Sequence, residues 1–334
     1  MASPTLLAGD IGGTKTLLSL YRPVGDRLEW LASERYSSAD WPDLAPIVQQ
    51  FLAAQAAAGA TPPAAACFAV AGPVQGGRAQ LTNLPWRLSE VELAAATGIP
   101  RVELVNDFGV LIYGLPHLQP EQQAPVRAGV PVAGAPLLVL GAGTGLGVAY
   151  GVPTAAGLVA IASEGSHGEF APRTCEEWQL KQWLQEQLGL ARVSIERVVS
   201  GTGLGLVARW LLMQQPDHPL SSVAADDRQD LPAAVAAAAA QGDALAGAAL
   251  SLWLSAYGST CGDLALAALV RGGIWLAGGT ASKLLPSLRS GAFERAFLNK
   301  GRMAAVLQPI PIKAITDPAI GSFSAACRAR MLLG

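Results

Sequence analysis

The feature that most constrains the fold of this 334-residue chain is a pattern that occurs twice: an apolar run, a glycine-rich turn and a second apolar run. The first copy spans Leu6–Tyr21 around Gly12 and Gly13, and the second spans Leu137–Tyr150 around Gly141–Gly147. Each copy predicts two strands joined as a hairpin. Because the copies are far apart in the chain, the pattern indicates two halves of similar build rather than a solenoid.

Strand and helix signals alternate around the two copies, which is typical of α/β proteins. Apolar runs predict strands over residues 67–71, 102–105 and 274–277. Helices are predicted over 41–58 after an N-cap at Asp40, from a capping box at Ser89 and Glu92 to Gly98, and from Asp317–Pro318 to Met331. The length suits two domains of roughly 150 residues each.

The composition excludes several classes of protein. Charged residues make up 14% of the chain, hydrophobic residues 51%, and the formal net charge is −2. A nucleic-acid binder would normally show a basic domain, and a disordered chain would show low hydrophobicity with high net charge. The single, scattered cysteines show no metal-ligand spacing and favour a reduced, cytoplasmic setting.

Two stretches are long and poor in charge, yet neither predicts a membrane span. No charged residue stands between Arg127 and Glu164, but prolines and glycines interrupt that segment too often for an apolar helix of about 20 residues. The alanine-rich stretch 233–270 carries Gln241, Asp243 and Asp263, which favours a buried helix. We expect no membrane partner.

The glycine turns indicate a divided nucleotide site. A third strand ends at Gly278-Gly279-Thr280, so three strand ends carry glycines with a threonine, and glycine lets backbone N–H groups approach phosphate oxygens. A single Walker A loop is excluded because no lysine follows a glycine. Residues 203–208 match a Rossmann fingerprint but lack a preceding βαβ start. Asp10, at a strand end, would lie near the magnesium ion that accompanies ATP.

These motifs resemble those of the bacterial glucokinase family, within the sugar-kinase and actin-like ATPase superfamily. Residues 10–15 (DIGGTK) and 141–147 (GAGTGLG) are similar to its two phosphate motifs, and residues 276–280 (LAGGT) to its adenosine motif. The family's sugar-binding motifs are matched by residues 104–108, 164–167 and 196–201, and further family motifs by residues 82–86 and 170–172. The likeness keeps the family order from about residue 5 to residue 330.

The resemblance implies an α/β fold of two ribonuclease-H-like domains around a central cleft. The small domain would comprise residues 1–115 plus 318–334, and the large domain residues 116–317. The resemblance also implies ATP and Mg²⁺ as cofactors, glucose as the substrate, a homodimer, and no nucleic-acid or membrane partner.

The resemblance also assigns the site residues. Glucose would be bound by Asn106, Asp107, Glu164, His167 and Glu196, and the nucleotide by Asp10, Gly12, Gly13, Thr14, Lys15, Gly143, Thr144, Gly145, Gly278 and Gly279. Asp10 would hold Mg²⁺ through water. A sugar hydroxyl needs a group that accepts its proton, and Asp107, directly after a buried strand, is the candidate general base.

This sequence departs from the family pattern at a few positions. Ser166 replaces the second glycine of the usual Glu-Gly-Gly-His, which would cost about 1 kcal/mol if that backbone needs positive φ. Ala142 stands where many members have proline. The zinc-binding branch of bacterial sugar kinases has closely spaced cysteines after the histidine, whereas this region contains only Cys175. We therefore expect no structural zinc.

The remaining residues are expected to have no catalytic role. Asn83 would support the sugar-binding residues without contacting sugar. His117 and His218 are expected to be solvent-exposed and inert. The segment Asp226–Asp230 is expected to be an exposed loop without chemistry.

Three alternative functions stay open from the sequence. A kinase for mannose, fructose or N-acetylglucosamine would share the phosphate turns. A sugar-sensing transcription regulator of this fold would carry an added helix-turn-helix, for which no room is expected because the first strand begins by about Thr5. A non-catalytic sugar-binding protein is disfavoured by the presence of both Asp10 and Asp107.

Overall fold

The computed structural model describes residues 4–81 and 83–334, so Thr82 of the 82–86 motif lies outside the described residues. The chain divides into two compact units. The first contains the described residues through Gln119 together with 154–162 and 317–334, and the second contains 120–153 and 163–316.

The first unit is built on a five-stranded sheet with the order β3-β2-β1-β4-β8. The strands are β1 (Thr5–Ile11), β2 (Lys15–Val24), β3 (Arg27–Ser37), β4 (Pro63–Val70) and β8 (Val102–Asn106). Its helices are α1 (Leu44–Ala57), α2 (Glu90–Thr97), α3 (Leu111–Gly114) and α14 (Ile320–Met331), with 3₁₀ helices η1 (Ser38–Asp40) and η2 (Leu115–His117). A small second sheet joins β5 (Val74–Gln75), β6 (Arg78–Gln80) and β7 (Arg87–Ser89).

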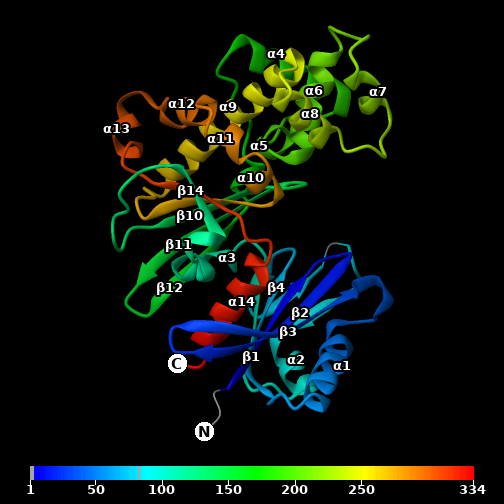
Figure 1. The fold of residues 1–334 in the computed structure, drawn as a ribbon, viewed down its shortest axis with the longest axis vertical. Coiled ribbons are helices and arrows are strands. Elements are labelled where there is room, and N and C mark those ends of the chain that lie inside the picture. Colours follow the sequence, from blue (N-terminus) through cyan, green and yellow to red (C-terminus); the bar gives the residue numbers. More distant parts are fainter. Residues whose placement is uncertain (1–3, 82) are drawn as a thin grey trace. The chain divides into compact units, whose positions relative to one another are not determined.

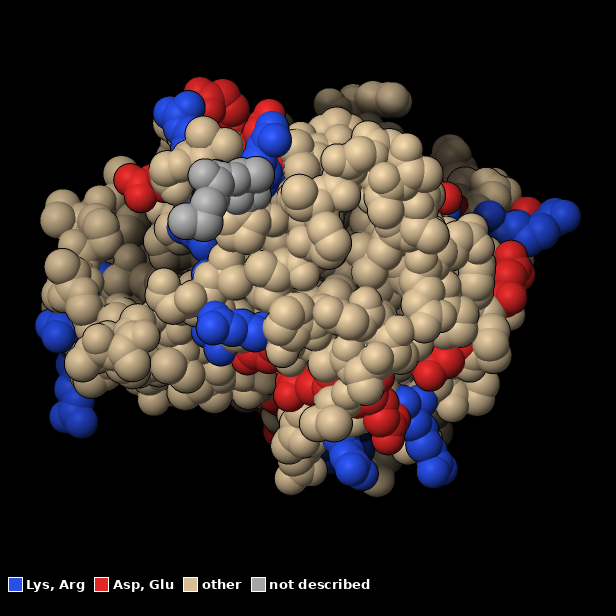
Figure 2. Space-filling view, turned by 90° about the horizontal axis from the view of Figure 1, so that it is seen from below, with Lys and Arg blue, Asp and Glu red and all other residues tan. Residues whose placement is uncertain are grey.

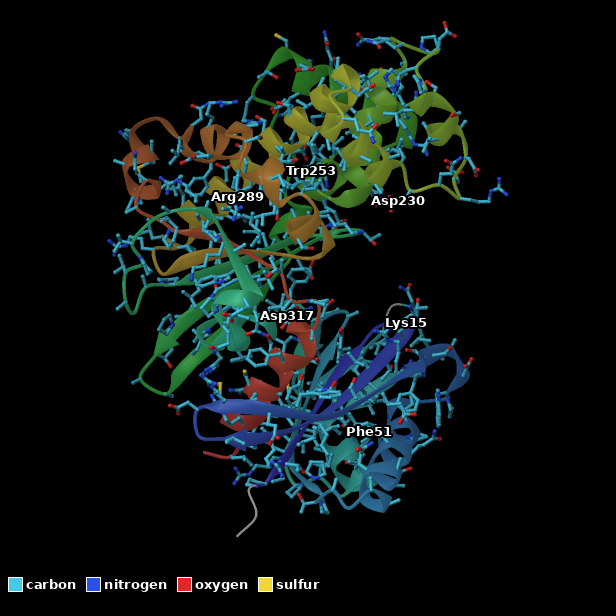
Figure 3. The ribbon with its side chains drawn as sticks, in the orientation of Figure 1. Lys15, Phe51, Asp230, Trp253, Arg289 and Asp317 are labelled. Atoms are coloured by element: carbon cyan, nitrogen blue, oxygen red, sulfur yellow. The ribbon has the colours of Figure 1, made fainter. Side chains whose placement is uncertain are left out.

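Helices cover both faces of this five-stranded sheet (Figure 1). Helices α1 and α2 lie on one face, where Phe51, Phe68 and Trp86 belong to one buried cluster. Helix α14 lies against β1 and β4 on the other face. In Figure 3, Phe51 lies inside this unit and Lys15 lies at the tip of the β1–β2 hairpin.

The second large sheet has the order β12-β11-β10-β13-β14-β9. The strands are β9 (Gln123–Arg127), β10 (Leu137–Ala142), β11 (Leu146–Thr154), β12 (Gly157–Ser163), β13 (Gly273–Ala277) and β14 (Ile312–Ile315). The helices of the second unit are α4 (Cys175–Leu188), α5 (Ile195–Val198), α6 (Gly201–Leu212), α7 (Leu220–Ala225), α8 (Leu231–Ala240), α9 (Ala244–Ala267), α10 (Gly279–Lys283), α11 (Leu285–Leu288), α12 (Ala292–Leu298) and α13 (Ala304–Leu307), with 3₁₀ helices η3 (Pro120–Gln122), η4 (Gly165–His167) and η5 (Gly301–Met303).

The two predicted hairpins are confirmed, and their surroundings match as well. Strands β1 and β2 pair antiparallel around the first glycine turn, and β10 and β11 pair in the same way around the second. Each hairpin is then joined by a parallel strand, β4 beside β1 and β13 beside β10. The α/β class and the repeated build are therefore confirmed.

The units differ in detail from the domains expected from the sequence. The first unit ends at Gln119 and resumes at Asp317, and it also includes residues 154–162, which were expected in the large domain. One physical reason is that the Ala160 N–H donates to the Tyr113 hydroxyl at 3.4 Å. Gly157 in the same segment lies close to the Met331 side chain.

Two of the predicted helix starts are wrong, and one is confirmed. Helix α1 begins at Leu44 with Asp43 as its N-cap, and Asp40 belongs to the 3₁₀ helix before it. Helix α2 does begin directly after Ser89 and end at Gly98, but the Ser89 side chain makes no capping hydrogen bond. Asp317 accepts from the Ala319 N–H at 2.8 Å, one turn before α14 begins at Ile320.

Helix α9 forms the centre of the second unit. Its 24 residues are mostly buried, and Trp253 and Tyr257 lie in the main core cluster with Phe293 of α12 (Figure 3 labels Trp253). Among the described helices, none taken singly has the length and hydropathy to span a membrane. Helices α8 and α9 meet those criteria only as a pair, and the pair is bent by 111°.

The sparse charge of the sequence is also visible on the surface. On the face shown in Figure 2, Lys, Arg, Asp and Glu side chains are scattered, and the two signs lie close together. On that face, the described residues form no extended basic surface of the kind that nucleic-acid binding requires.

The contact between α9 and α12 gives a test of packing. A Cβ added at Gly258 would lie 2.1 Å from the Phe293 carbonyl oxygen, so the two helices would have to separate. We expect Gly258→Ala to lower the free energy of unfolding by roughly 1–3 kcal/mol, measured by urea unfolding with tryptophan fluorescence. Gly247→Ala in the same helix is the matched control, because a Cβ there meets nothing within 4 Å and should stabilise by about 0.5–1 kcal/mol. A wild-type urea midpoint for Gly258→Ala would contradict this account of the contact.

Candidate active site

The first glycine turn is held in place by a residue that the sequence did not single out. The Gly12 N–H donates to the Lys15 carbonyl at 3.0 Å, which closes the turn between β1 and β2. The buried Ser38 then donates from its hydroxyl to the Gly12 carbonyl at 2.9 Å and from its N–H to the Thr14 carbonyl at 3.0 Å. Thr14 and Lys15 are exposed beside these bonds. The carbonyls of Gly12, Thr14 and Lys15 are thus engaged, while the side chains of Thr14 and Lys15 stay accessible.

The second glycine turn is braced by the start of α6. The Gly143 carbonyl accepts from the Gly201 N–H at 2.7 Å, and the Thr144 carbonyl accepts from the Thr202 hydroxyl at 2.9 Å. The Gly143 N–H donates to the Gly145 carbonyl at 2.8 Å. The Thr144 side chain remains exposed. The turn is therefore fixed from behind and presents an accessible hydroxyl.

The third glycine turn packs directly on the second. Gly278 has φ +84°, a left-handed conformation that favours glycine, and a Cβ there would lie 3.2 Å from the Ala142 carbonyl oxygen. The Thr280 hydroxyl donates to that same carbonyl. The two turns meet because β10 and β13 are parallel neighbours, with Gly141 opposite Ala277. Residues Gly143, Thr144 and Gly279 consequently line one cavity of about 590 Å³.

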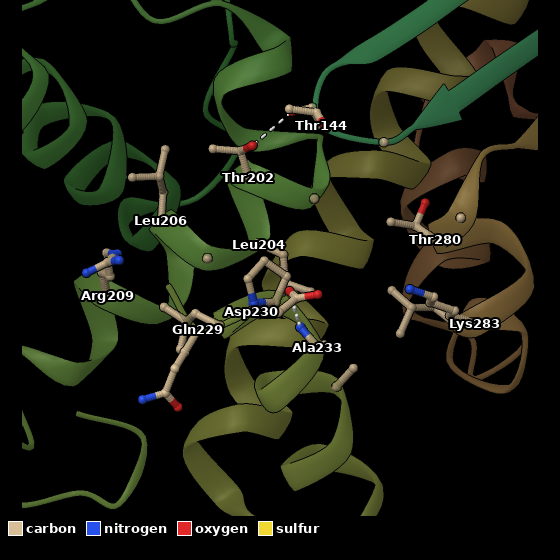
Figure 4. A pocket seen from close by; sticks show the side chains of 18 of the residues that line it. Thr144, Thr202, Leu204, Leu206, Arg209, Gln229, Asp230, Ala233, Thr280 and Lys283 are labelled. Atoms are coloured by element: carbon tan, nitrogen blue, oxygen red, sulfur yellow. Dashed lines mark hydrogen bonds between the residues drawn. The ribbon is translucent and has the colours of Figure 1, made fainter. Parts of the chain in front are cut away.

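This cavity lies entirely in the second unit and is shown in Figure 4. Its lining also includes Asp227, Gln229 and Asp230, which come from the loop before α8. The exposed loop expected over Asp226–Asp230 is confirmed, and three of its side chains border this pocket of ligand size. Leu204, Leu206, Leu231 and Pro232 supply an apolar wall.

The candidate base is fixed at the end of β8 by its neighbour. The Asn106 amide donates to Asp107 Oδ1 and to the Gly72 carbonyl, both at 3.0 Å. The Asn106 side-chain oxygen accepts from the N–H groups of Phe108 and Gly109 at 3.1 and 3.0 Å. This network orients the Asp107 carboxylate, so Asn106 serves as its support in this structure.

Asp107 and the first glycine turn border one small cavity of about 180 Å³. Asn83 lines the same cavity and lies against Gly13, where a Cβ would approach the Asn83 Cβ to 2.8 Å. The role expected for Asn83, support of the sugar-binding residues, stays a prediction. Since β1, β4 and β8 are parallel neighbours, their carboxyl ends bring these residues together at one edge of the sheet.

Asp10 stands in the register of β1 opposite Ala69 of β4, at the same edge. Its side chain remains accessible to solvent, but protein atoms crowd it, and the resulting loss of hydration raises the pKa of the carboxyl above its ordinary value. Gly321, in the first turn of α14, lies beside this carboxylate. A cation would relieve the cost of its charge, so the donor type and surroundings of Asp10 fit a hydrated Mg²⁺ ion. No group of three or more His, Cys, Asp or Glu side chains that could hold a metal occurs among the described residues.

The three predicted sugar ligands of the second unit lie on two connected segments. Glu164 and His167 belong to the turn of η4, with the imidazole Nε2 3.5 Å from the Glu164 carboxylate, and both are exposed. The Gly168 carbonyl accepts from the Ile195 N–H at 2.9 Å, which ties this turn to α5 and Glu196. Arg192 adds a hydrogen bond to the His167 carbonyl at 2.8 Å, a contact that the sequence gave no signal for.

Glu196 connects the sugar motif to the second phosphate turn. Its Oε2 atom accepts from the Leu146 N–H at 2.9 Å, and a Cβ at Gly145 would lie 2.3 Å from that oxygen. Gly145 is therefore needed for the approach of the carboxylate.

Ser166 carries no backbone strain in this structure. It is buried within η4, and in the described chain only Leu269 among non-glycine residues has a positive φ. The cost considered for a left-handed serine therefore does not arise.

His117 and His218 differ from their expected exposure. His218 is largely buried, with Nε2 3.0 Å from Asp243, the N-cap of α9. His117 is half-buried with Nε2 3.3 Å from the Arg330 guanidinium, and burial together with that charge lowers the pKa of its imidazole. Both histidines have structural contacts.

Comparison with known proteins identifies a family for the whole chain. The sequence matches the family described as Glucokinase over residues 7–332. It is 42% identical to a glucokinase of Synechocystis, with 96% of each chain covered, and 40% identical to one of Nostoc punctiforme, with 98% of this chain and 99% of the relative covered. The fold also matches the crystal structure of a glucokinase from an Antarctic psychrotroph, with a TM-score of 0.84, 28% identity and 98% of each chain covered.

The raised pKa of Asp10 predicts a pH-dependent gain in stability for Asp10→Asn. Because the folded-state pKa lies above the unfolded value of about 3.9, the folded protein loses stability as pH rises through the raised pKa. The asparagine variant should unfold at higher urea concentration than wild type at pH 7, and the difference should shrink towards pH 3.5. Asp40→Asn, which removes one exposed carboxylate of the same unit, controls for net charge. A difference that is equal at both pH values would contradict the assignment.

Proposed function

The chain belongs to the glucokinase family, and from that membership we propose that it transfers the γ-phosphoryl group of ATP to the 6-hydroxyl of glucose, giving glucose 6-phosphate and ADP. The observation that carries this proposal is the arrangement at the end of β8. Asp107 is oriented there by Asn106 and lines a cavity together with Gly13 of the first glycine turn.

We assign Asp107 the role of general base. A neutral alcohol is a poor nucleophile, so a carboxylate within hydrogen-bond reach accepts its proton as the new P–O bond forms. The Asn106 amide donates to Asp107 Oδ1, which fixes the carboxylate in one orientation. The carboxylate held in this orientation is the proposed acceptor of the hydroxyl proton.

The proposed glucose ligands are Asn106, Asp107, Glu164, His167 and Glu196. Carboxylates that accept from sugar hydroxyls discriminate strongly, because an analogue that lacks one hydroxyl leaves a buried acceptor unpaired. Accessible carboxylate, imidazole and amide groups supply the mixture of donors and acceptors that a hexose needs.

The nucleotide is proposed to bind the three braced glycine turns. Their residues are Gly12, Gly13, Thr14 and Lys15 in the first, Gly143, Thr144 and Gly145 in the second, and Gly278 and Gly279 in the third. Mg²⁺ would be held by Asp10 through water and would neutralise part of the phosphate charge. With the turn carbonyls engaged by the protein, the exposed side chains of Thr14, Lys15 and Thr144 offer hydroxyl and ammonium donors to phosphate oxygens.

The wider setting follows from the same proposal. We place the reaction at the entry of glucose into glycolysis in the cytoplasm, in a homodimeric enzyme.

The base assignment predicts that Asp107→Asn lowers kcat for glucose about 10²–10⁴-fold. The amide keeps the size of the side chain but cannot accept the hydroxyl proton, so the KM for glucose should change far less. Steady-state kinetics measure both, and thermal unfolding verifies that the variant is folded. A kcat close to wild type in a folded variant would remove Asp107 from this role.

The hexose specificity is tested by an ATP-consumption assay with glucose, mannose, fructose and N-acetylglucosamine. We expect the highest kcat/KM with glucose. A higher value with another hexose would reassign the substrate within the same chemistry, and no turnover with any hexose would favour a non-catalytic sugar-binding protein.

A further inference from the structure

The charged side chains around the 590 Å³ cavity differ in what they contact. Arg209 is engaged by the Ala224 carbonyl and by Asp227, whose carboxylate lies 3.3 Å from its guanidinium. Asp230 caps α8 by accepting from the Ala233 N–H at 3.1 Å. Lys283, the remaining charged residue of the lining, makes no hydrogen bond or ion pair with any described residue. It extends from the end of α10 toward the cavity (Figure 4).

The cavity also has two chemically different sides. Gln229 and Asp230 lie with the apolar residues of α6 and α8, whereas Thr144, Thr280 and Lys283 lie with the second and third glycine turns (Figure 4). Asp227, from the same loop as Asp230, also lines the cavity. The carboxylates of the first side repel phosphate, and its leucines and proline suit a flat, apolar ring. The second side offers the exposed Thr144 hydroxyl, a glycine backbone without side chains and an unpaired cation, which suit phosphate.

We propose that the Lys283 ammonium binds the phosphate chain of the nucleotide, whose base and ribose lie against α6, α8 and the Asp227–Asp230 loop. This inference rests on the proposed function and adds to it a binding residue and an orientation. It goes beyond the proposed nucleotide ligands because neither Lys283 nor the Asp227–Asp230 loop belongs to the glycine turns. Lys283 contributes a point charge on a flexible stem, so it can follow the phosphates without a fixed geometry.

The proposed orientation of the nucleotide accounts for the position of Lys283 at the end of α10. Lys283 lies four residues after Gly279, about one helical turn, and therefore on the side of α10 that carries the third glycine turn. Arg209, the other cation of the lining, is held among the acidic loop residues and is not available to phosphate. A negatively charged chain in this cavity thus has one accessible cationic partner among the described lining residues.

The test compares ADP with adenosine by calorimetry, in the presence of magnesium, on wild type and on Lys283→Met. Methionine keeps the length and the apolar stem but removes the charge. We expect about a tenfold weaker affinity for ADP, a shallower salt dependence of ADP binding, and an unchanged affinity for adenosine. Lys283→Arg should restore most of the ADP affinity. Arg302→Met, which removes an exposed cation outside the cavity, should leave all affinities unchanged.

The outcomes separate this inference from the proposed function. If wild type binds ADP and phosphorylates glucose but Lys283→Met binds ADP as tightly as wild type, the role of Lys283 is overturned and the kinase proposal stands. Equal weakening of ADP and adenosine would also overturn it, since the side chain would then support the cavity rather than bind phosphate. If wild type binds ADP but phosphorylates no sugar, the proposed function fails while the ADP comparison still decides the role of Lys283.

Discussion

Parallel strand pairing is the constraint on which the rest of the structure depends. Because β1 pairs in parallel with β4, and β4 with β8, the first glycine turn and Asp107 emerge at one edge of the sheet. The same pairing of β10 with β13 sets the second glycine turn beside the third. Each hairpin turn therefore gains a neighbouring strand end, which a hairpin alone would not provide. In each unit, the proposed site residues of the glycine turns lie at the carboxyl ends of these parallel strands.

A glycine turn that is free to open in any direction would bind phosphate poorly, and this chain constrains its turns through hydrogen bonds to carbonyl oxygens of the first and second turns. Ser38 holds the first turn, the start of α6 holds the second, and Thr280 ties the third to Ala142. In each case the partner comes from another part of the chain. Backbone carbonyls repel phosphate oxygens, so engaging them with protein donors removes an unfavourable electrostatic contact and also rigidifies the turn.

Local sequence patterns predict most strands and helices, whereas the residues that contact each of them depend on long-range contacts. The hairpins follow from apolar runs that flank glycines, and both are present. The predicted start of α1 after Asp40 is wrong because Pro42 disfavours helical backbone at Trp41, which is extended, so the helix begins after Asp43 instead. Ser38, Arg192 and the Asp227–Asp230 loop are far in sequence from the turns that they support or border. Their roles carry no local signal and follow only from the fold.

Because this chain has few charged residues, each charged side chain that lines the second-unit cavity is informative about what the cavity can bind. In a chain with 14% charged residues, a cation without a partner beside a glycine turn is unlike a surface lysine on a highly charged protein, where neighbouring carboxylates compete for it. The acidic loop opposite it is neutralised in part by Arg209 and in part by the N-terminus of α8, which Asp230 caps. The cavity therefore has an acidic side and a cationic side before any ligand enters. A nucleotide, apolar at one end and anionic at the other, matches this arrangement in one orientation only, and this asymmetry orders the phosphate chain towards the glycine turns.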